Sequence, residues 1–311
     1  MLGLKITIEK SVEVNQTIDQ MMTLLSDLST FRAWSPWSCL DDNTKIEIGG
    51  EKNTIGHFQT WESEFTGSGN MTISKISQNR IDLDLEFFKP FQTKSKTWFL
   101  LQAKDSSTII TWGMESKLSI FMFFFKKMMT AYLGNDFERG LTRLKELAET
   151  GKVNCVLSDV VKVEQPELFY IGEHHQCSFA DLKIKMNQSF DKIMKDIEAR
   201  KIPIPNGFVS IYHKVDPING QCDVTTSVFY YQKENDVPGY ENKVLPKHHA
   251  LRVNLSGPYI HLPSAWGKIS VFQRVKKFDL NKPLPMYEIY HNSPKMVEPK
   301  DVLTEIRLPV H

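Results

Sequence analysis

The chain has 311 residues, which is enough for two domains, and its 41% hydrophobic and 24% charged content is that of an ordinary globular protein. Lys and Arg number 18 against 19 Asp and Glu in residues 1–152, and 20 against 18 in residues 153–311. Nucleic acids and anionic membranes attract basic surfaces, so this balance argues against both as partners.

The N-terminus carries no secretion signal, and the most apolar run, residues 118–125, is eight residues long. A helix needs about 20 apolar residues to span a bilayer. We therefore interpret the run as buried core and expect a cytoplasmic protein with no membrane partner. The four cysteines are scattered along the chain, which favours reduced, structural thiols.

The first half predicts a strand at residues 5–14, a helix, several antiparallel strands and a long closing helix. Thr17 and Gln20 have capping-box spacing at the start of the first helix. The closing helix carries apolar residues at spacings of three and four from Met129 to Ala148. The segments with period-two character are residues 56–65, 69–76, 80–87, 93–101 and 107–114. A curved sheet wrapped around a long helix leaves a cavity between them.

The second half contains one unit twice. Each copy has a helix, a Pro-containing break, a strand and then a β-rich run, in residues 179–231 and again in residues 262–310, and a strand at residues 159–174 precedes the first copy. Ile211-Tyr212-His213 in the first copy aligns with Ile289-Tyr290-His291 in the second. A repeated unit usually buries its apolar face against its twin. The pattern predicts a pseudo-twofold pair of βαββ units with a ligand cleft between them.

Tryptophan is concentrated in the first half, where Trp61 and Trp112 lie in predicted strands. Alternation puts Trp112 on the face of Ile110 and Met114. These two tryptophans are candidates for lining a hydrophobic cavity that holds a flat or acyl ligand. The alternative is ordinary core packing, because tryptophan contributes strongly to cores.

Glu288 interrupts an otherwise apolar strand. It shares a face with Tyr290, and Ser210 and Tyr212 occupy the corresponding positions of the first copy. A carboxylate beside aromatic rings binds a cation, or acts as a general base if burial raises its pKa. The alternative is a solvent-facing glutamate on an edge strand.

Cofactor and metal sites are not expected. The chain has no GxGxxG, Walker or GxSxG pattern. Adjacent residues of a strand point to opposite faces, so neither His174-His175 nor His248-His249 chelates one ion easily.

The first half resembles the polyketide cyclase/START-like helix-grip superfamily (SRPBCC) over residues 3–150. The residues that carry the resemblance are Trp34-Ser35-Pro36-Trp37, Gly49-Gly50, Gly56, Trp61, Gly67-x-Gly69-x-Met71, Thr111-Trp112 and Gly134-Asn135-Asp136-Phe137-x-x-Gly140-Leu141-x-x-Leu144-Lys145. The superfamily includes lipid carriers, hormone receptors and cyclases, so the resemblance implies a fold and not an activity.

The second half resembles the GyrI-like effector-binding domain over residues 157–311. The residues that carry this resemblance are Gly207, Tyr212, Asp216-Pro217, Gly257-Pro258-Tyr259, Ala265-Trp266, Pro285-x-x-Glu288-x-Tyr290, Ser293-Pro294 and Thr304-Glu305-Ile306-x-Leu308-Pro309-Val310. In regulators with this domain a glutamate framed by aromatic residues recognises cationic lipophilic drugs, and by position that role falls on Glu288. Some members use such a glutamate for hydrolysis. The regulators' DNA-binding domain is replaced here by the START-like half.

The predicted class is α+β. Residues 1–152 are expected to form a helix-grip domain, with an antiparallel sheet around a long C-terminal helix, and residues 153–311 a pseudo-twofold tandem βαββ domain. Its cleft is expected to hold Glu288, Tyr290, Tyr212 and Trp266. The favoured function is binding of a small hydrophobic molecule, either neutral or cationic, as a sensor or sequestering protein. A hydrolase of a xenobiotic or reactive metabolite, and a regulator that acts through a protein partner, remain open.

Overall fold

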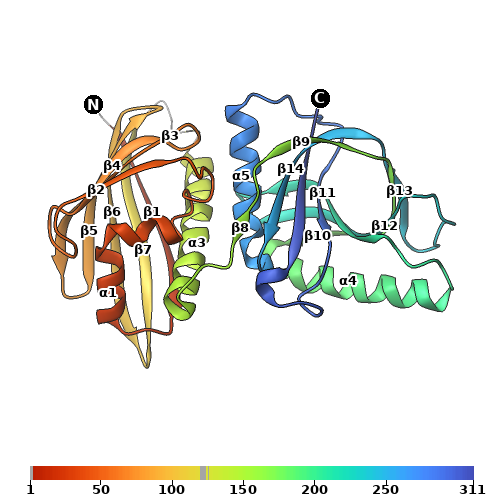
Figure 1. The fold of residues 1–311 in the computed structure, drawn as a ribbon, viewed down its shortest axis with the longest axis horizontal. Helices are drawn as coiled ribbons and strands as arrows, with labels where there is room; N and C mark the ends of the chain where they lie inside the picture. The colour runs from red at the N-terminus through yellow and green to blue at the C-terminus, as the bar shows by residue number, and fades with distance from the viewer. Residues whose placement is uncertain (1–2, 120–123, 125) are drawn as a thin grey trace. The chain divides into compact units, whose positions relative to one another are not determined.

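The computed structural model describes residues 3–119, 124 and 126–311. The chain divides into two compact units, Met1–Val153 and Asn154–His311, each with its own antiparallel sheet (Figure 1). The predicted mixed α+β class is confirmed. None of the described helices combines the length and the apolar character needed to cross a bilayer.

The first unit has a seven-stranded antiparallel sheet with the strand order β1-β7-β6-β5-β4-β3-β2. Its strands are β1 (Gly3–Val14), β2 (Lys45–Gly49), β3 (Phe58–Ser63), β4 (Gly67–Ser77), β5 (Arg80–Lys89), β6 (Thr93–Lys104) and β7 (Ser107–Ser119). Its helices are α1 (Ile18–Ser26), α2 (Phe31–Trp34) and α3 (Lys126–Thr150), with a 3-10 turn at Leu28–Thr30. The capping box of Thr17 and Gln20 is present at the start of α1. The sequence did not predict β2, a short edge strand that pairs only with β3.

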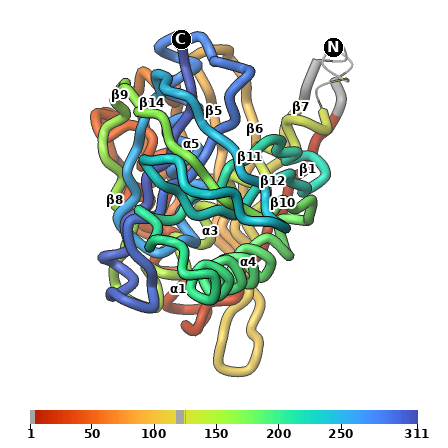
Figure 2. The backbone as a smooth tube through the Cα atoms, turned by 90° about the vertical axis from the view of Figure 1, so that its right-hand side faces the viewer, coloured from red at the N-terminus to blue at the C-terminus, as the bar shows by residue number. Residues whose placement is uncertain are grey.

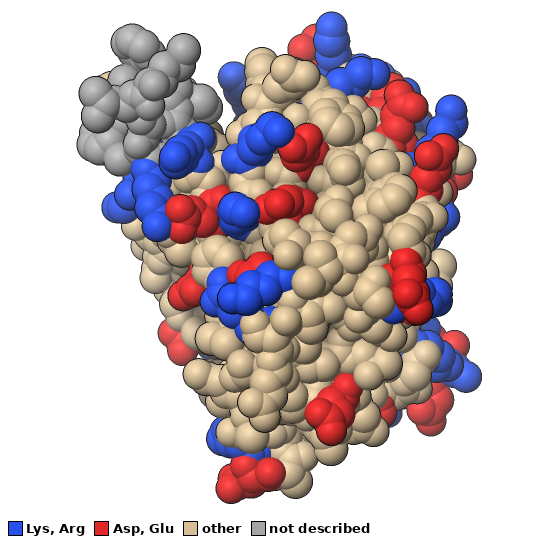
Figure 3. All heavy atoms as spheres, turned by 90° about the vertical axis from the view of Figure 1, so that its left-hand side faces the viewer, with Lys and Arg blue, Asp and Glu red and all other residues tan. Residues whose placement is uncertain are grey.

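One core fills the space between the sheet and the helices of the first unit. The alternating residues Ile81, Leu83 and Leu85 of β5 enter it, as do Phe137 and Leu141 of α3. The outer side of β5 and β6 instead carries opposite charges in cross-strand pairs, with Lys96 Nζ 2.7 Å from Asp84 Oδ1. Figure 3 shows basic and acidic side chains interspersed on the face it presents. Such exposed pairs contribute little stability, so the buried apolar residues hold this unit together.

The apolar run at residues 118–125 was predicted to be buried core. Residues 120–123 and 125 lie outside the described residues, so most of this prediction stays untested. The side chain of Phe124 is 87% exposed, and for that residue the prediction is wrong.

The second unit has a nine-stranded antiparallel sheet with the order β13-β10-β12-β11-β15-β16-β14-β8, and β9 also pairs with β14. Its strands are β8 (Val156–Leu157), β9 (Val161–Gln165), β10 (Leu168–Ser178), β11 (Gly207–Asp216), β12 (Gln221–Tyr230), β13 (Glu241–Leu245), β14 (His248–Ser256), β15 (Met286–Tyr290) and β16 (Leu303–Val310). Its helices are α4 (Phe179–Ala199) and α5 (Leu262–Val275), with 3-10 turns at Tyr259–His261 and Pro299–Asp301. The single strand predicted at residues 159–174 is two strands, separated by Pro166, which has no N–H to donate to a ladder.

The element order β-α-β-β occurs twice in the second unit, as β10-α4-β11-β12 and as β14-α5-β15-β16. Helix α4 packs against β10 and β12 (Figure 2), and α5 against β14 and β16. The strand that follows the helix in each copy, β11 or β15, pairs antiparallel with its counterpart in the middle of the sheet. The residues of β11 and β15 are therefore where the two copies meet.

We expect fragments 1–153 and 154–311 each to fold when expressed alone, because each has its own sheet and its own buried apolar clusters. Circular dichroism during urea unfolding should show a cooperative transition for each fragment. Two fragments without a cooperative transition would contradict the division into independent units.

Candidate functional site

The register of the two central strands places Glu288 at the junction of the βαββ copies. Glu288 of β15 lies directly opposite Ser210 of β11, and Tyr212 lies opposite Met286. Residues opposite each other on neighbouring strands point to the same face of a sheet. Glu288, Tyr290 and Tyr212 therefore share one face, while Tyr287 lies on the other.

The Glu288 carboxylate accepts three hydrogen bonds from neutral donors. Trp266 Nε1 on α5 donates to Oε1 at 2.6 Å, and the hydroxyls of Tyr212 and Tyr290 donate to Oε2 at 3.0 and 2.5 Å. Glu288 is only 1% exposed. We call Glu288 and its three donors the Glu288 cluster. It joins two strands and a helix around one enclosed carboxylate.

Burial raises the pKa of Glu288, and the hydrogen bonds from Tyr290, Trp266 and Tyr212 oppose the increase. Burial, followed by the charge of Glu288, raises the pKa of Tyr212 and of Tyr290 well above the usual tyrosine value. Both hydroxyls therefore remain protonated and keep donating. A buried carboxylate whose three donors are all neutral is stabilised further by a proton or by a bound cation.

Two more aromatic side chains contact the cluster. Tyr259 packs edge-on against Tyr290 with ring centroids 5.6 Å apart, and Phe190 of α4 does so at 5.9 Å. The sequence analysis did not predict either as a site residue. Phe190 lies on the apolar face of its helix, which indicates burial but not proximity to Glu288. Tyr259 is part of the Gly257-Pro258-Tyr259 motif that carries the resemblance to the GyrI-like domain, and that motif is the sequence signal that could have indicated it.

Trp61 and Trp112, the other candidates, belong to the first unit. Trp112 is 3% exposed, donates its N–H to Thr97 Oγ1 at 3.0 Å and stacks on Phe137 with centroids 4.1 Å apart. Gly140 permits this approach, because a Cβ there would lie 2.7 Å from the Trp112 ring. Trp112 thus belongs to the buried core cluster of the first unit. Trp61 is partly exposed and packs edge-on against Phe87.

Replacing Trp112 with alanine should lower the free energy of unfolding by about 3–5 kcal/mol, because it leaves a large cavity in the core. Trp61→Ala is the matched control, and its effect should be clearly smaller because the Trp61 side chain is only partly buried. Urea unfolding of both variants measures the difference. Equal losses would contradict the assignment of Trp112 as a core residue.

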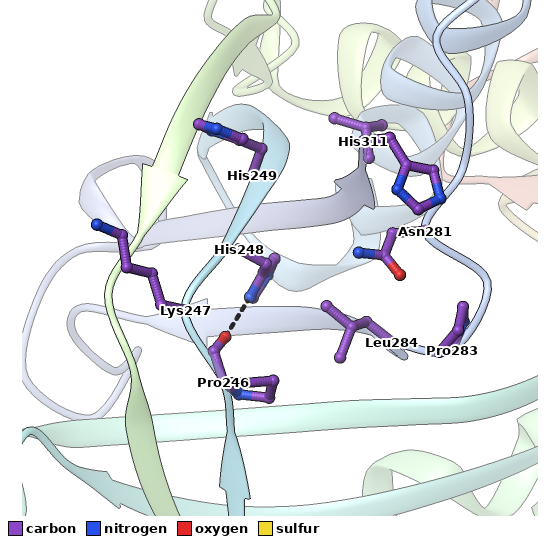
Figure 4. Close-up of a pocket in the computed structure, with 9 residues that line it drawn as sticks. Pro246, Lys247, His248, His249, Asn281, Pro283, Leu284 and His311 are labelled. Atoms are coloured by element: carbon purple, nitrogen blue, oxygen red, sulfur yellow. Dashed lines mark hydrogen bonds between the residues drawn. The ribbon is translucent and has the colours of Figure 1, made fainter.

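A pocket drawn in Figure 4 lies apart from the Glu288 cluster. Its lining residues are Pro246, Lys247, His248, His249, Asn281, Pro283, Leu284, Val310 and His311. His248 closes one side, where its Nδ1 contacts the Pro246 carbonyl at 2.7 Å and its Nε2 contacts the Tyr287 hydroxyl at 3.1 Å. None of the four residues of the Glu288 cluster lines this pocket.

Residues 158–311 match the family model of the GyrI-like small molecule binding domain. The second unit is therefore a GyrI-like domain, as the motifs in its sequence predicted. The comparison with curated protein sequences found no match.

Among solved structures, the chain is similar to EcmrR in a complex with DNA, at 15% identity and a TM-score of 0.42 over 62% of this chain and 72% of that one. It is also similar to SAV2435 bound to tetraphenylphosphonium, at 12% identity and a TM-score of 0.40, over 50% and 94% of the two chains. The Aha1 dimer from Colwellia psychrerythraea matches at 14% identity and a TM-score of 0.35, over 47% and 98%.

The buried carboxylate predicts how stability depends on pH. The folded-state pKa of Glu288 is raised above the usual 4.5, so the stability it contributes is fully present below that value and is lost as pH rises through the folded pKa. Glu288→Gln cannot ionise. The variant should therefore gain stability relative to the wild type as pH rises, measured by urea unfolding from about pH 4 to about pH 8.

The control for this experiment is Glu298→Gln, which removes an exposed carboxylate of the same unit. Its stability should follow the wild type at every pH. Parallel curves for wild type and Glu288→Gln would show that Glu288 does not titrate differently in the folded state.

Proposed function

We propose that the GyrI-like domain binds a hydrophobic organic cation at the Glu288 cluster, and that the protein acts as a sensor or sequestering protein for it. The observation that carries the proposal is the enclosed carboxylate with three neutral hydrogen-bond donors. A bound cation would supply the missing positive charge, and the rings of Tyr212, Tyr290 and Trp266 would supply apolar contact and cation–π attraction. The match of residues 158–311 to a family of small-molecule binding domains supports the same proposal.

Ligand access to the cluster requires movement, because Glu288 is enclosed. Among the elements that cover the Glu288 face of the sheet, the N-terminal half of α4 is the least tightly packed. The buried residues of α4 begin at its midpoint and are Ser189, Ile193 and Ile197, whereas Phe179 and Ile184 in its first half are exposed. Leu182 and Trp266, one from each helix, are only partly buried where they pack near Tyr212. We therefore place the route to Glu288 between the start of α4 and α5.

The arrangement of the carboxylate favours binding over hydrolysis. A general base needs a free lone pair directed at the water or hydroxyl that it deprotonates. Here Oε2 accepts from two tyrosines and Oε1 accepts from Trp266, so only one lone pair, on Oε1, is left for a proton transfer. Recognition of a cation requires only the negative charge of the Glu288 carboxylate, and the cation can approach while the three hydrogen bonds are kept.

For the first unit we propose a START-like helix-grip domain. Its antiparallel sheet, with α3 as the long last element, supports this assignment. The motifs around Trp34, Gly67 and Gly134 support it as well. The chain would then join two ligand-binding folds.

Binding of tetraphenylphosphonium, a lipophilic cation, tests the proposal, with neutral triphenylphosphine oxide for comparison. Glu288→Gln should weaken the cation by roughly ten- to a hundredfold, because a charge-assisted contact contributes about 1.5–3 kcal/mol. The affinity for the neutral compound should change far less. Isothermal titration calorimetry on the full-length protein provides the measurement.

Glu298→Gln serves as the control here too, because it changes the net charge equally at an exposed position outside the cluster. It should bind the cation as the wild type does. Equal losses in the two variants, or no loss in either, would mean that Glu288 does not recognise the cation.

A further inference from the structure

Two of the four cysteines meet across neighbouring strands beside the Glu288 cluster. Cys177 of β10 lies directly opposite Cys222 of β12 in the antiparallel register. Their Sγ atoms are 3.7 Å apart, and the residues are 6% and 5% exposed. Cys39 and Cys155, in contrast, are only partly buried. The chain therefore holds one close dithiol and two further cysteines that serve as internal controls.

The backbone of this pair suits a disulfide. Residues directly opposite each other in an antiparallel ladder have Cα atoms about 4.5 or 5.5 Å apart. Both separations fall within the range of about 4.4–6.8 Å that disulfides span. Rotation of the two side chains is then sufficient to bring the sulfur atoms of Cys177 and Cys222 to bonding distance, while the strands stay in place.

We infer that Cys177 and Cys222 form an oxidisable dithiol that a hydroperoxide converts into a cross-strand disulfide. One thiol first releases its proton, and the thiolate sulfur then attacks a peroxide oxygen. An S–O bond forms, the O–O bond breaks, and the leaving hydroxide takes up the released proton and departs as water, which leaves a sulfenic acid. The second thiol then attacks that sulfur, and a second water leaves. The two thiols lose two protons and two electrons, and hydrogen peroxide becomes two molecules of water.

The environment makes this oxidation slow. Burial, then the hydrogen bond with Cys177, raises the pKa of Cys222 to about 12. Thiolate is the reactive form, so little of Cys222 is reactive at neutral pH. Proximity fixes which pair of cysteines becomes linked, whereas burial limits the rate.

The dithiol packs against Tyr212, which donates a hydrogen bond to Glu288. Cys177, Cys222 and Tyr212 belong to one buried cluster, against which Trp266 also packs. Tyr212 and Trp266 both donate to Glu288. Closure of the disulfide would shift the sulfur atoms within the buried cluster that includes Tyr212 and contacts Trp266, so oxidation should also alter Trp266 fluorescence. The dithiol itself does not depend on cation binding.

The test is oxidation of the reduced full-length protein with hydrogen peroxide, followed by thiol titration in denaturant and non-reducing peptide mapping. Two of the four thiols should disappear, and the map should contain one linked pair of peptides carrying Cys177 and Cys222. The thermal midpoint should rise by a few degrees, because the link closes a long loop in the unfolded chain. Dithiothreitol should reverse both changes.

Cys177→Ser and Cys222→Ser should each abolish the linked peptides, whereas Cys39→Ser should retain them. If either serine variant fails to fold, the wild-type map still decides the question. Four persistent thiols at saturating peroxide would overturn the inference. A map in which Cys39 or Cys155 is linked in place of this pair would overturn it as well.

Discussion

The enclosed charge of Glu288 is the constraint on which the arrangement of the second domain depends. A carboxylate removed from water is unfavourable unless polar groups replace its hydration. Tyr212, Tyr290 and Trp266 replace it, and they come from β11, β15 and α5. Glu288 therefore reaches all three donors only when β11 pairs with β15 in this register and α5 packs in its observed position on the sheet.

The cluster also shows why the two βαββ copies cannot be identical. Their equivalent tyrosines, Tyr212 and Tyr290, donate to the same oxygen of Glu288. Each copy therefore contributes one tyrosine hydrogen bond to the same carboxylate. The position opposite Glu288 is Ser210. A second glutamate there would place two buried carboxylates directly across from each other, where they would repel. The two copies therefore share one backbone arrangement but carry different side chains, Ser210 and Glu288, at the equivalent position.

A second carboxylate on the same sheet shows what sets Glu288 apart. Glu305 of β16 accepts hydrogen bonds from His291 and Arg307, both of which can be cationic. Although burial raises its pKa, the hydrogen bond from His291 and the charge of Arg307 lower the pKa of Glu305 to about 2. Glu305 thus has the guanidinium of Arg307 as a cationic partner, whereas the donors to Glu288 are neutral. This difference is the physical basis for proposing a ligand at Glu288 and not at Glu305.

Patterns along the chain predict features that depend on neighbouring residues and on repetition. Alternation placed Glu288 and Tyr290 on one face, and the repeat aligned Tyr212 with Tyr290. The structure adds that Trp112 is buried against Phe137, that Phe190 and Tyr259 pack against Tyr290, and that Cys177 faces Cys222. Each of these depends on strand register or on the packing of a helix against a sheet. Register and packing join residues far apart in the chain, so local patterns carry little information about them.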